Sequence, residues 1–597
     1  MAKYPKSILN LTSDEAREFF LMKESYCSLN LPKYFDFENL LKQAVSVLGV
    51  SELDTKNNQI FNEVKNEKGV LKAVKYSDFQ DINYTFQLNK TKTTYRPVTI
   101  IHPYLYVDLV NCITNKENWG ELINRLNGLR EKSKDKIVCH SIPFVPEEKG
   151  DEKKEASLNF WKSIEQESIK LSLEYNYITQ VDISNFYGSI YTHTIPWAIH
   201  GITKAKKDKK DDNLLGNKID KKFQYMNNCE TVTIPQGNKI SDFIAEILLA
   251  YLDHQLLESL DQQEFSKPFK ILRYRDDYRI FTNSIEDASY IKRELISILQ
   301  RHKLSLGESK TSQSSDVIYA SIKEDKHYWI NNDPVIKITN DKIYQKPKQF
   351  ALKFVPFLRY GSKKLKNDRF KWIMDNRIYT ATVQKHLLII KKFADQYPNS
   401  GQLIGAFKEF DNRIVDWKLK DFEHAGTDIA VLLSIVTDIV KNNPKVTDSG
   451  VKTISYLLNC IDYKISFYDI ISSLRDHREI KSDYEYKLLL LTQIYSNLAK
   501  FSYNDYLEIW FQRLVVKNLG EDSPFIDDYS SKVSNKFVKL VCEVMRNKQP
   551  KNRVSIFCED WIKDDKKIDI ISFINKDEID ILDEVISGFE INTSEYI

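Results

Sequence analysis

One segment of the chain, FKILRYRDDYRIFTN at residues 269–283, combines two strand-forming runs with a tight turn between them. Aromatic and β-branched residues are frequent in both runs, so we expect a β-hairpin with the carboxylates of Asp276 and Asp277 side by side at its tip. The same dipeptide occurs at three other places, where charged neighbours predict a solvated surface: Asp211-Asp212, Asp527-Asp528 and Asp564-Asp565. The hairpin copy differs because three further segments accompany it in order.

The first of these segments is an apolar strand that ends at Asp182, in the run YITQVDISNFY. The second, TIPQGNKISDFIAEILLAYLD, is a glycine turn that leads into a helix with an apolar face, and the third is LSLGESKT, which contains Lys310. A strand-end carboxylate and the carboxylate pair of a neighbouring hairpin can converge, which makes Asp182, Asp276 and Asp277 a candidate metal site. For Asp182 alone the alternative is a helix N-cap, because polar residues follow it.

Three converging carboxylates predict nucleotidyl transfer on two metal ions. Such a reaction needs two Mg²⁺ ions about 3.5–4 Å apart, which stabilise the attacking and the leaving oxygen. Mg²⁺ takes carboxylate oxygens together with phosphates and water, and Mn²⁺ is the alternative ion. Ile183 would add its backbone carbonyl to the ligands of the three aspartates. We therefore expect millimolar Mg²⁺ to stabilise the fold.

The four segments resemble the conserved motifs of the reverse transcriptases. VDISNFY is similar to motif A, TIPQGNKIS to motif B, the Y-x-D-D box YRDD to motif C, and LSLGESKT to motif D. YRPVTIIHPYLYVDLV, at residues 95–110, resembles the fingers element that precedes motif A. By its motifs the resemblance covers about residues 20 to 345. Arg275 departs from it, since the family commonly has a small or apolar residue at the second place of the box.

The resemblance implies a role for five further residues. Tyr187 matches the aromatic gate that excludes a ribose 2′-OH, which favours deoxynucleotides, although a buried core tyrosine is the alternative. Gln236 and Gly237 match the turn that approaches the incoming nucleotide, where glycine permits close backbone contact. Lys310 matches the lysine that gives a proton or positive charge to departing pyrophosphate. Arg96 is our candidate for binding the triphosphate, because a guanidinium can hold phosphate oxygens in pairs.

Two more segments, YTHTIPWAIHG at 191–201 and LNLPKYFDFENLL at 29–41, resemble the abortive-infection and defence-associated reverse transcriptases of bacteria. That subgroup implies DNA synthesis from dNTPs in the cytoplasm of cells under phage attack. In several members synthesis needs no template and starts on a protein hydroxyl, which leaves single-stranded DNA covalently attached. Others copy a partner non-coding RNA. The subgroup also implies homo-oligomers that form through the helical domain. No tyrosine matches a priming motif, so none is assigned.

The expected fold is α+β. It has a fingers and palm polymerase domain at residues 1–345, and an all-α C-terminal domain at 346–597 that stacks as HEAT-like helical repeats or an irregular bundle. Glycine is scarce, 17 of 597 residues, which favours helix. Apolar residues at helical spacing predict four C-terminal helices. Their faces are Val383, Leu387, Ile390 and Ala394; Ile429, Leu432, Val436 and Ile439; Tyr484, Leu488, Leu491, Tyr495 and Leu498; and Val533, Phe537, Leu540 and Val544.

Charge and cysteine content are consistent with a cytoplasmic nucleic-acid enzyme. Lys and Arg number 87 against 84 Asp and Glu, a net charge of +3, so local patches must bind nucleic acid. The run Lys204 to Asp212 is one such patch, or simply a solvated, mobile insertion. The seven cysteines lack zinc spacing and predict reduced thiols. We expect no membrane span, since the longest apolar run is short and contains Glu246.

Two alternatives to a protein-primed polymerase stay open. One is an RNA-templated reverse transcriptase that uses a partner RNA or serves a retroelement. Against the retroelement form, the C-terminal sequence shows no convincing nuclease or RNase H motif. The other alternative is a catalytically inactive helical scaffold, against which the intact set Asp182, Asp276 and Asp277 argues.

Overall fold

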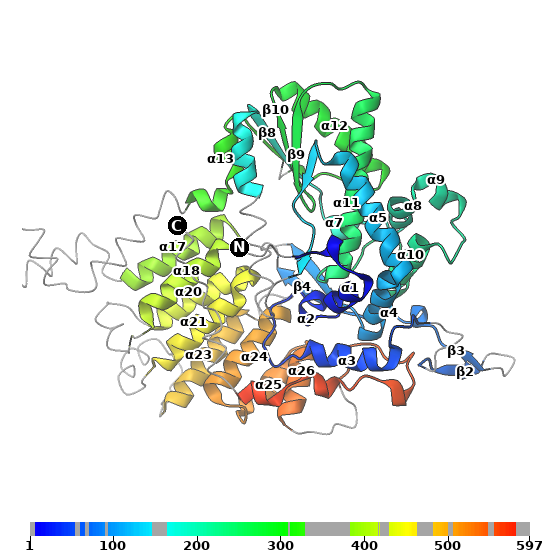
Figure 1. Ribbon diagram of the computed structural model, residues 1–597. Coiled ribbons are helices and arrows are strands. Elements are labelled where there is room, and N and C mark those ends of the chain that lie inside the picture. Colours follow the sequence, from blue (N-terminus) through cyan, green and yellow to red (C-terminus); the bar gives the residue numbers. More distant parts are fainter. Residues whose placement is uncertain are drawn as a thin grey trace, which may run out of the picture.

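A computed structural model describes residues 6–53, 60–65, 71–89, 94–145, 164–308, 311–328, 382–415, 417, 429–461, 482–498, 505–546 and 554–580. A mixed sheet occupies one end of the molecule and a stack of helices the other (Figure 1). The expected boundary between residues 345 and 346 lies outside the described residues, so the division into two domains stays a prediction.

The central sheet has five strands in the order β11-β8-β10-β9-β6. Only β6 pairs in parallel, with β9, and the other neighbours are antiparallel. Its strands are β6 (Ile137–Cys139), β8 (Tyr177–Asp182), β9 (Phe269–Tyr274), β10 (Asp277–Thr282) and β11 (Ser312–Ser314). The predicted hairpin is confirmed as β9 and β10. Three two-stranded sheets lie outside it, formed by β1 (Lys6–Ser7) with β7 (Phe144–Val145), β2 (Glu63–Lys65) with β3 (Leu71–Ala73), and β4 (Tyr84–Asn89) with β5 (Tyr95–Ile100).

Both faces of the central sheet are covered by apolar side chains. Successive side chains of a strand point to opposite sides, so each strand contributes to both faces. Val181 and Ile271 belong to the main core, which also holds buried side chains of α11 (Lys239–Gln262) and α12 (Ile285–Arg301). Ile178 and Leu272 belong to a smaller apolar cluster with Val317 of α13 (Val317–Ser321). The sheet is therefore held between two layers, and its strand ends are what it can present to a substrate.

The first half has further helices, several of which contact α11. They are α1 (Ser13–Phe20), α2 (Lys23–Tyr26), α3 (Phe37–Leu48), α4 (Pro103–Thr114), α5 (Lys116–Ser133), α7 (Phe186–Ser189), α8 (Thr194–His200), α9 (Ile202–Lys207) and α10 (Leu215–Met226). The predicted apolar face of α11 is confirmed, since Ile244, Leu248 and Leu252 are at most 2 % exposed. The side chain of Asn238 caps this helix by accepting from the amide of Ser241 at 2.8 Å.

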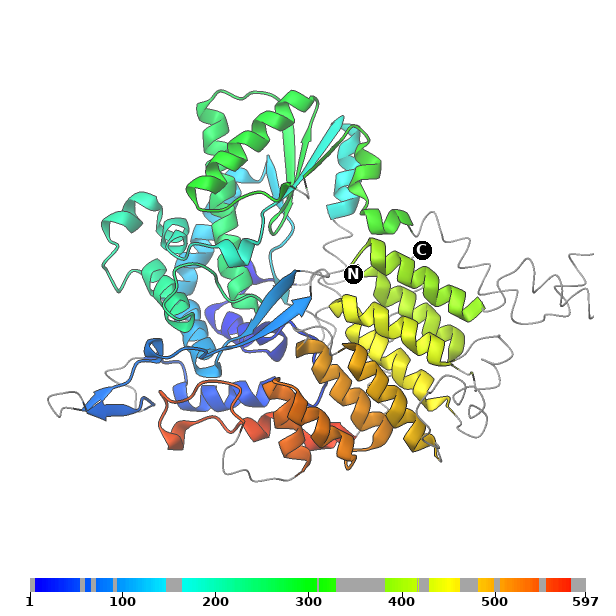
Figure 2. The same cartoon turned by 180° about the vertical axis from the view of Figure 1, so that it is seen from behind.

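The described residues between 382 and 546 are almost entirely helical. Their helices are α17 (Thr382–Gln396), α18 (Gln402–Ile414), α20 (Ile429–Asn442), α21 (Thr447–Asn459), α23 (Asp483–Leu498), α24 (Asp505–Leu519), α25 (Pro524–Lys532) and α26 (Lys536–Met545). They stack in chain order, and the stack lies beside the β4–β5 hairpin in both views (Figures 1 and 2). An all-helical region is thus confirmed, whereas a HEAT-like repeat stays a prediction.

Three of the four predicted helix faces are buried as expected, with Val533 placed just before its helix. The prediction for α23 is partly wrong. Tyr484 is 42 % exposed, whereas Tyr486, Leu490 and Ile494 are buried together with Leu491 and Leu498. Four consecutive leucines at 488–491 make this helix apolar on more than one side, so periodicity alone does not fix the buried face.

The N-terminal segment binds the helical stack directly. Asn30 donates from its side-chain amide to Asp448 Oδ2 at 2.7 Å, and its carbonyl accepts from the Tyr506 hydroxyl at 2.6 Å and from the Trp510 indole at 3.1 Å. The guanidinium of Arg513 lies 5.4 Å from the centre of the Tyr34 ring. The segment at 29–41, which the sequence singled out, therefore joins the two halves of the molecule.

The last described segment, residues 554–580, returns to the N-terminal region instead of extending the stack (Figures 1 and 2). Isolated β-bridges join Phe35 to Ile574 and Phe61 to Ile562. The Tyr104 hydroxyl donates to the carbonyl of Lys566 at 2.7 Å. The helical prediction for residues 346–597 did not anticipate this return, which places both chain ends of the described structure in one core.

A buried histidine and a half-buried glutamate lie close together where this segment packs on α4. The His102 side chain is 0 % exposed, and its Nε2 lies 4.0 Å from Oε1 of Glu559. Burial lowers the pKa of His102 to about 3. Burial also raises the pKa of Glu559, to about 7. Both side chains are therefore neutral in the folded protein at weakly acidic pH.

We expect the contributions of His102 and Glu559 to the pH dependence of stability to be opposite in sign and to offset each other. The unfolded chain has an ordinary histidine near pKa 6.5 and an ordinary glutamate near 4.5. Between these values the lowered pKa of His102 makes stability rise with pH, whereas the raised pKa of Glu559 makes it fall, each by up to about 1.4 kcal/mol per pH unit. Urea unfolding at pH 5 and 6.5 should show Glu559→Gln losing stability on acidification and His102→Asn gaining it. Equal slopes in the two variants would contradict the pairing.

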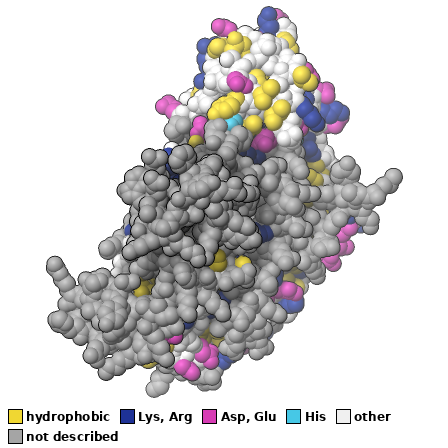
Figure 3. All heavy atoms as spheres, turned by 90° about the vertical axis from the view of Figure 1, so that its left-hand side faces the viewer, with side chains coloured by type: hydrophobic (Ala, Val, Ile, Leu, Met, Phe, Trp, Pro, Cys, Tyr) yellow, Lys and Arg dark blue, Asp and Glu magenta, His cyan; other side chains and the backbone are white. Residues whose placement is uncertain are grey.

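No described helix is both long and apolar enough to cross a bilayer. The seven cysteines all lie in the described residues, and none of them forms a disulfide there. On the face drawn in Figure 3, basic, acidic and hydrophobic side chains intermix over the described surface, in line with the small net charge.

Candidate active site

The register of the central sheet places two of the predicted carboxylates opposite each other. Asp182, the last residue of β8, is the direct partner of Asp277, the first residue of β10. The amide of Ile183 donates to the carbonyl of Asp276 at 3.1 Å, which makes Asp182 and Asp277 a non-hydrogen-bonded pair. Side chains of such a pair share one face with their Cβ atoms about 4.5–5.5 Å apart. Asp182 is thus a strand-end residue, and the helix that follows has Asn185 at its N-cap instead.

The third carboxylate lies on the two-residue turn between β9 and β10. Tyr274 pairs with Asp277, so Arg275 and Asp276 form the turn itself. Arg275 has a φ of 53°, and Asp276 is not among the residues of positive φ, as in a type II′ turn. Burial raises the pKa of Tyr274, and the carboxylates of Asp242, Asp277 and Asp276 raise it further while Arg275 opposes them. Negative charge is therefore concentrated around the turn.

Tyr187 lies beside the carboxylates, on the short helix α7. It follows Asn185, whose φ of 44° turns the chain sharply after β8. The side chain is 8 % exposed, and its hydroxyl donates to Oδ1 of Asp242 at 2.6 Å. Burial and the neighbouring Asp242 raise the pKa of Tyr187 well above its ordinary value. The ring is thus both buried and hydrogen-bonded, which fits a fixed gate as well as a core tyrosine.

Backbone contacts hold the Gln236-Gly237 turn from both sides. The amide of Thr99 on β5 donates to the carbonyl of Gln236 at 2.9 Å, and the amide of Ser28 donates to that of Gly237 at 2.8 Å. Gly237 has a φ of 113°, and a Cβ there would come within 2.5 Å of Val98 Cγ1. Only glycine allows the turn to approach Val98 this closely. Through these contacts the turn connects α11 to the β4–β5 hairpin.

Arg96 lies on that hairpin, opposite Leu88, and its side chain is exposed. It is near the helical stack as well as the turn, because its charge helps to lower the pKa of Lys445, after the larger effect of burial. The structure therefore places Arg96 between the two halves of the molecule.

The loop after α12 contacts Asp182 through its backbone. The amide of Gly307 donates to the carbonyl of Asp182 at 2.8 Å, and the amide of Ser184 donates to that of Ser305 at 2.8 Å. A Cβ at Gly307 would lie 3.5 Å from Oδ2 of Asp182. Lys310, three residues further, lies outside the described residues, so its predicted role stays untested.

A buried ionic cluster behind the turn was missed by sequence reasoning. Arg273 is 0 % exposed; its Nε donates to Oδ2 of Asp253 at 2.7 Å, and its Nη2 donates to Glu246. Another nitrogen, Nη1, donates to the carbonyl of Arg275 at 3.2 Å, which ties the cluster to the turn. Ser141 links the same parts, because its hydroxyl accepts from the Arg275 amide at 2.9 Å and donates to Glu246 at 2.8 Å.

The sequence did contain a signal for this cluster. Asp242, Glu246 and Asp253 are four and seven residues apart, so they lie on one face of α11. Arg273 and Arg275 are two residues apart in the hairpin. Acidic residues at helical spacing in an apolar helix, matched by arginines at strand spacing, indicate a helix that packs against that strand. Considered alone, Glu246 indicates only that the apolar run is too polar to span a membrane.

Burial affects the two acids of the cluster differently. Burial raises the pKa of Asp253 more than Arg273 lowers it, so the net shift is upward. For Glu246 burial also acts upward, but Arg273 and hydrogen bonds from Cys139 and Ser141 outweigh it, and the pKa is lowered. Arg273 is the only charge compensation that these two carboxylates receive from the described residues.

The donors at the strand ends suit a hard divalent cation. Asp182 and Asp277 offer carboxylate oxygens on one face, and like charges directly opposite each other destabilise a sheet unless a cation lies between them. Within the described part of the chain, no three His, Cys, Asp or Glu side chains are already arranged as a metal site. Asp276 would thus have to turn its side chain towards the pair for all three to bind.

Magnesium should therefore stabilise the protein. At ten times its dissociation constant, a ligand that binds only the folded state adds about 1.4 kcal/mol, which corresponds to a rise in Tm of a few degrees. Thermal melts with 0 to 20 mM Mg²⁺ (on the order of typical Mg²⁺ dissociation constants) would measure it. The rise should disappear in Asp182→Asn/Asp277→Asn. A wild-type Tm that does not change with Mg²⁺, with and without dNTP, would contradict the proposed metal site.

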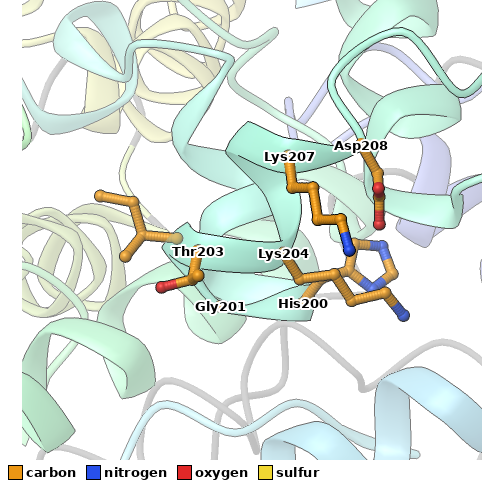
Figure 4. A pocket seen from close by; sticks show the side chains of 7 residues that line it. His200, Gly201, Thr203, Lys204, Lys207 and Asp208 are labelled. Atoms are coloured by element: carbon orange, nitrogen blue, oxygen red, sulfur yellow. The ribbon is translucent and has the colours of Figure 1, made fainter.

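The basic run at 204–212 is mostly exposed to solvent, as predicted. Its first half belongs to α9, which buries Ala205 and places Lys206 Nζ 5.4 Å from the centre of the Trp197 ring. A depression of about 550 Å³ lies against this helix, lined by His200, Gly201, Ile202, Thr203, Lys204, Lys207 and Asp208 (Figure 4). Nitrogens of His200 engage Gly216 and Glu121, so the imidazole is part of the scaffold. This depression is distinct from the carboxylate site.

Comparison with known families identifies the polymerase part of the chain. Residues 88–350 match the family described as "Reverse transcriptase (RNA-dependent DNA polymerase)". This match includes every predicted site residue, from Arg96 to Lys310, and it identifies a nucleotidyltransferase domain of the RNA-directed DNA polymerase type. No curated protein matches the chain.

Solved structures with some likeness to the chain include telomerases of two yeasts. Telomerase of Candida albicans, in complex with a fragment of telomeric RNA, is 12 % identical over 66 % of this chain and 68 % of that one, with a TM-score of 0.25. Apo telomerase of Candida tropicalis is 11 % identical over 88 % and 90 %, with a TM-score of 0.26. Scores this low support no conclusion about function.

Proposed function

We propose that this protein is a DNA polymerase of the reverse transcriptase type that acts in antiphage defence by abortive infection. It synthesises single-stranded DNA from dNTPs without a template and starts on a hydroxyl of the protein itself. The observation that carries the polymerase assignment is the pairing of Asp182 with Asp277 next to the Asp276 turn. The defence role rests on the resemblance of residues 29–41 and 191–201.

Each residue then has a task in the proposed reaction. Asp182, Asp276, Asp277 and the carbonyl of Ile183 would hold two Mg²⁺ ions, which supply charge neutralisation for the attacking and leaving oxygens. Arg96 would bind the triphosphate from the β4–β5 hairpin.

Tyr187 would lie against the sugar and exclude a 2′-OH. The Gln236-Gly237 turn would contact the nucleotide, and Lys310 would assist the departing pyrophosphate.

The helical half has a proposed role as well. Because residues 29–41 lie directly against α21 and α24, the stack can limit what enters the polymerase part from that side. We propose that this half, residues 346–597, also forms homo-oligomers, and that the protein acts in the bacterial cytoplasm. Chemical crosslinking and light scattering of the full chain would measure the assembly.

The deciding experiment incubates RNase-treated protein with Mg²⁺ and labelled dNTPs, with no nucleic acid added. The products are resolved on a denaturing gel before and after protease treatment. Label that migrates with the protein and is released by protease supports protein-primed synthesis. Label that forms only when RNA and a primer are supplied supports the templated alternative instead. No label under either condition leaves the helical scaffold.

A further inference from the structure

One carboxylate, that of Asp242, connects the tyrosine beside the active site to the turn that carries the aspartates. Its Oδ1 accepts from the Tyr187 hydroxyl at 2.6 Å, and its Oδ2 accepts from Arg275 Nη2 at 2.8 Å. Lys239 Nζ is 3.9 Å from the same Oδ2. The Asp242 side chain is 14 % exposed and lies in the first turn of α11. Three chain segments therefore meet at a single acid.

A gate works only if its ring stays in place, because a functional group must be held to within about 0.5 Å. The helix that carries Tyr187 has only four residues, Phe186–Ser189, and cannot by itself fix the ring. Bulk alone would be supplied equally well by phenylalanine. The hydroxyl bond to the Asp242 carboxylate adds a directional contact that a core tyrosine does not need for packing.

The second oxygen of Asp242 accounts for Arg275, the unusual residue of the Y-x-D-D box. Arg275 lies next to Asp276 in the turn, and its guanidinium points to Asp242. Held there, its charge is neutralised and cannot compete with a cation for the catalytic carboxylates. Asp242 can thus influence the choice of sugar through Tyr187 and the rate through Arg275.

We propose that Asp242 is a positioning residue that makes the enzyme select deoxyribonucleotides, because it fixes the Tyr187 ring against the place of the sugar. It does not touch the substrate. The proposal rests on the proposed function, since it needs a polymerase whose gate is Tyr187. It adds a residue to the specificity of that site and assigns a task to Arg275.

The test compares kcat/KM for dNTPs and rNTPs in the full-length protein. Tyr187→Phe and Asp242→Ala should each lower the dNTP preference at least about ten-fold, the effect of one hydrogen bond to a charged group. The change should come mainly from higher kcat/KM for rNTPs. Because both variants break the same bond, the double variant should lose no more preference than Asp242→Ala alone. Asp261→Ala, an exposed acid on the same helix, is the matched control.

Arg275→Met separates the two contacts of Asp242. The dNTP preference of this variant should stay within about two-fold of wild type, because the Tyr187 bond is intact. Equal losses of kcat/KM for both sugars in Tyr187→Phe, or multiplying effects in the double variant, would overturn the proposal. A wild-type protein that incorporates no nucleotide contradicts the proposed function and this inference together, whereas an active enzyme with an unchanged preference contradicts the inference alone.

Discussion

Asp276→Ala should reduce dNTP incorporation by at least about a thousand-fold, a loss of roughly 4 kcal/mol of transition-state stabilisation. The side chain belongs to the carboxylate set of the proposed metal site, and no other described residue on the turn can replace it. Single-turnover incorporation with saturating dNTP and Mg²⁺ would measure the loss. The fold should survive, because Asp276 is half-buried on a turn and the strand pairing depends on its backbone.

Asp528→Ala provides a matched control for this variant. Asp528 also belongs to an Asp-Asp dipeptide, but it is exposed and forms an ion pair with Lys532 at 2.6 Å. We expect it to keep wild-type incorporation, since exposed ion pairs contribute about 0–1 kcal/mol. If Asp276→Ala retains incorporation, or keeps its full effect on phage growth, the helical scaffold becomes the better account of this protein.

Arg273→Met should destabilise the fold by about 3–5 kcal/mol, since it leaves Glu246 and Asp253 buried without their cation. The loss should be smaller at acid pH, where the two carboxylates can take up protons. Urea unfolding at pH 5 and 8 would measure both effects. Arg301→Met, an exposed arginine at the end of α12, should change stability by less than about 0.5 kcal/mol.

A triple variant keeps this prediction testable even if Arg273→Met does not fold. Arg273→Met/Glu246→Gln/Asp253→Asn removes all three charges, and it should recover most of the lost stability, because the single change costs mainly through uncompensated burial. The triple variant should nevertheless stay slower in dNTP incorporation, since the bond from Arg273 to the carbonyl of Arg275 is gone. A triple variant less stable than Arg273→Met would show that the cluster stabilises by attraction alone.

Much of the active-site geometry could be predicted because it depends on local sequence. Strand propensity and the turn residues predict the β9–β10 hairpin, and apolar periodicity predicts most helix faces. The sequence predicted that Asp182 lies near the hairpin carboxylates, but not that Asp277 is its direct partner, since register between distant strands is set by how their side chains pack.

The rest needed contacts that no local pattern contains. The Arg273 cluster depends on which helix covers which strand, and the acids of α11 are separated from Arg273 by 20 to 27 residues. The task of Asp242 follows from two hydrogen bonds to different segments. The return of residues 554–580 has no periodicity to reveal it, because short turns and isolated bridges make most of its contacts.

That return has a consequence for how the protein is made. Phe35 pairs with Ile574, which follows it in the chain by 539 residues. This contact of the N-terminal core therefore cannot form until Ile574 has been synthesised. At about 5–20 residues per second, a ribosome needs roughly 30 to 110 s to synthesise the chain between them. During that time the apolar side chains around Phe35 and Phe61 lack part of their cover. These contacts of the core can form only after residues 554–580 have left the ribosome, which would delay DNA synthesis until that part of the chain has been made.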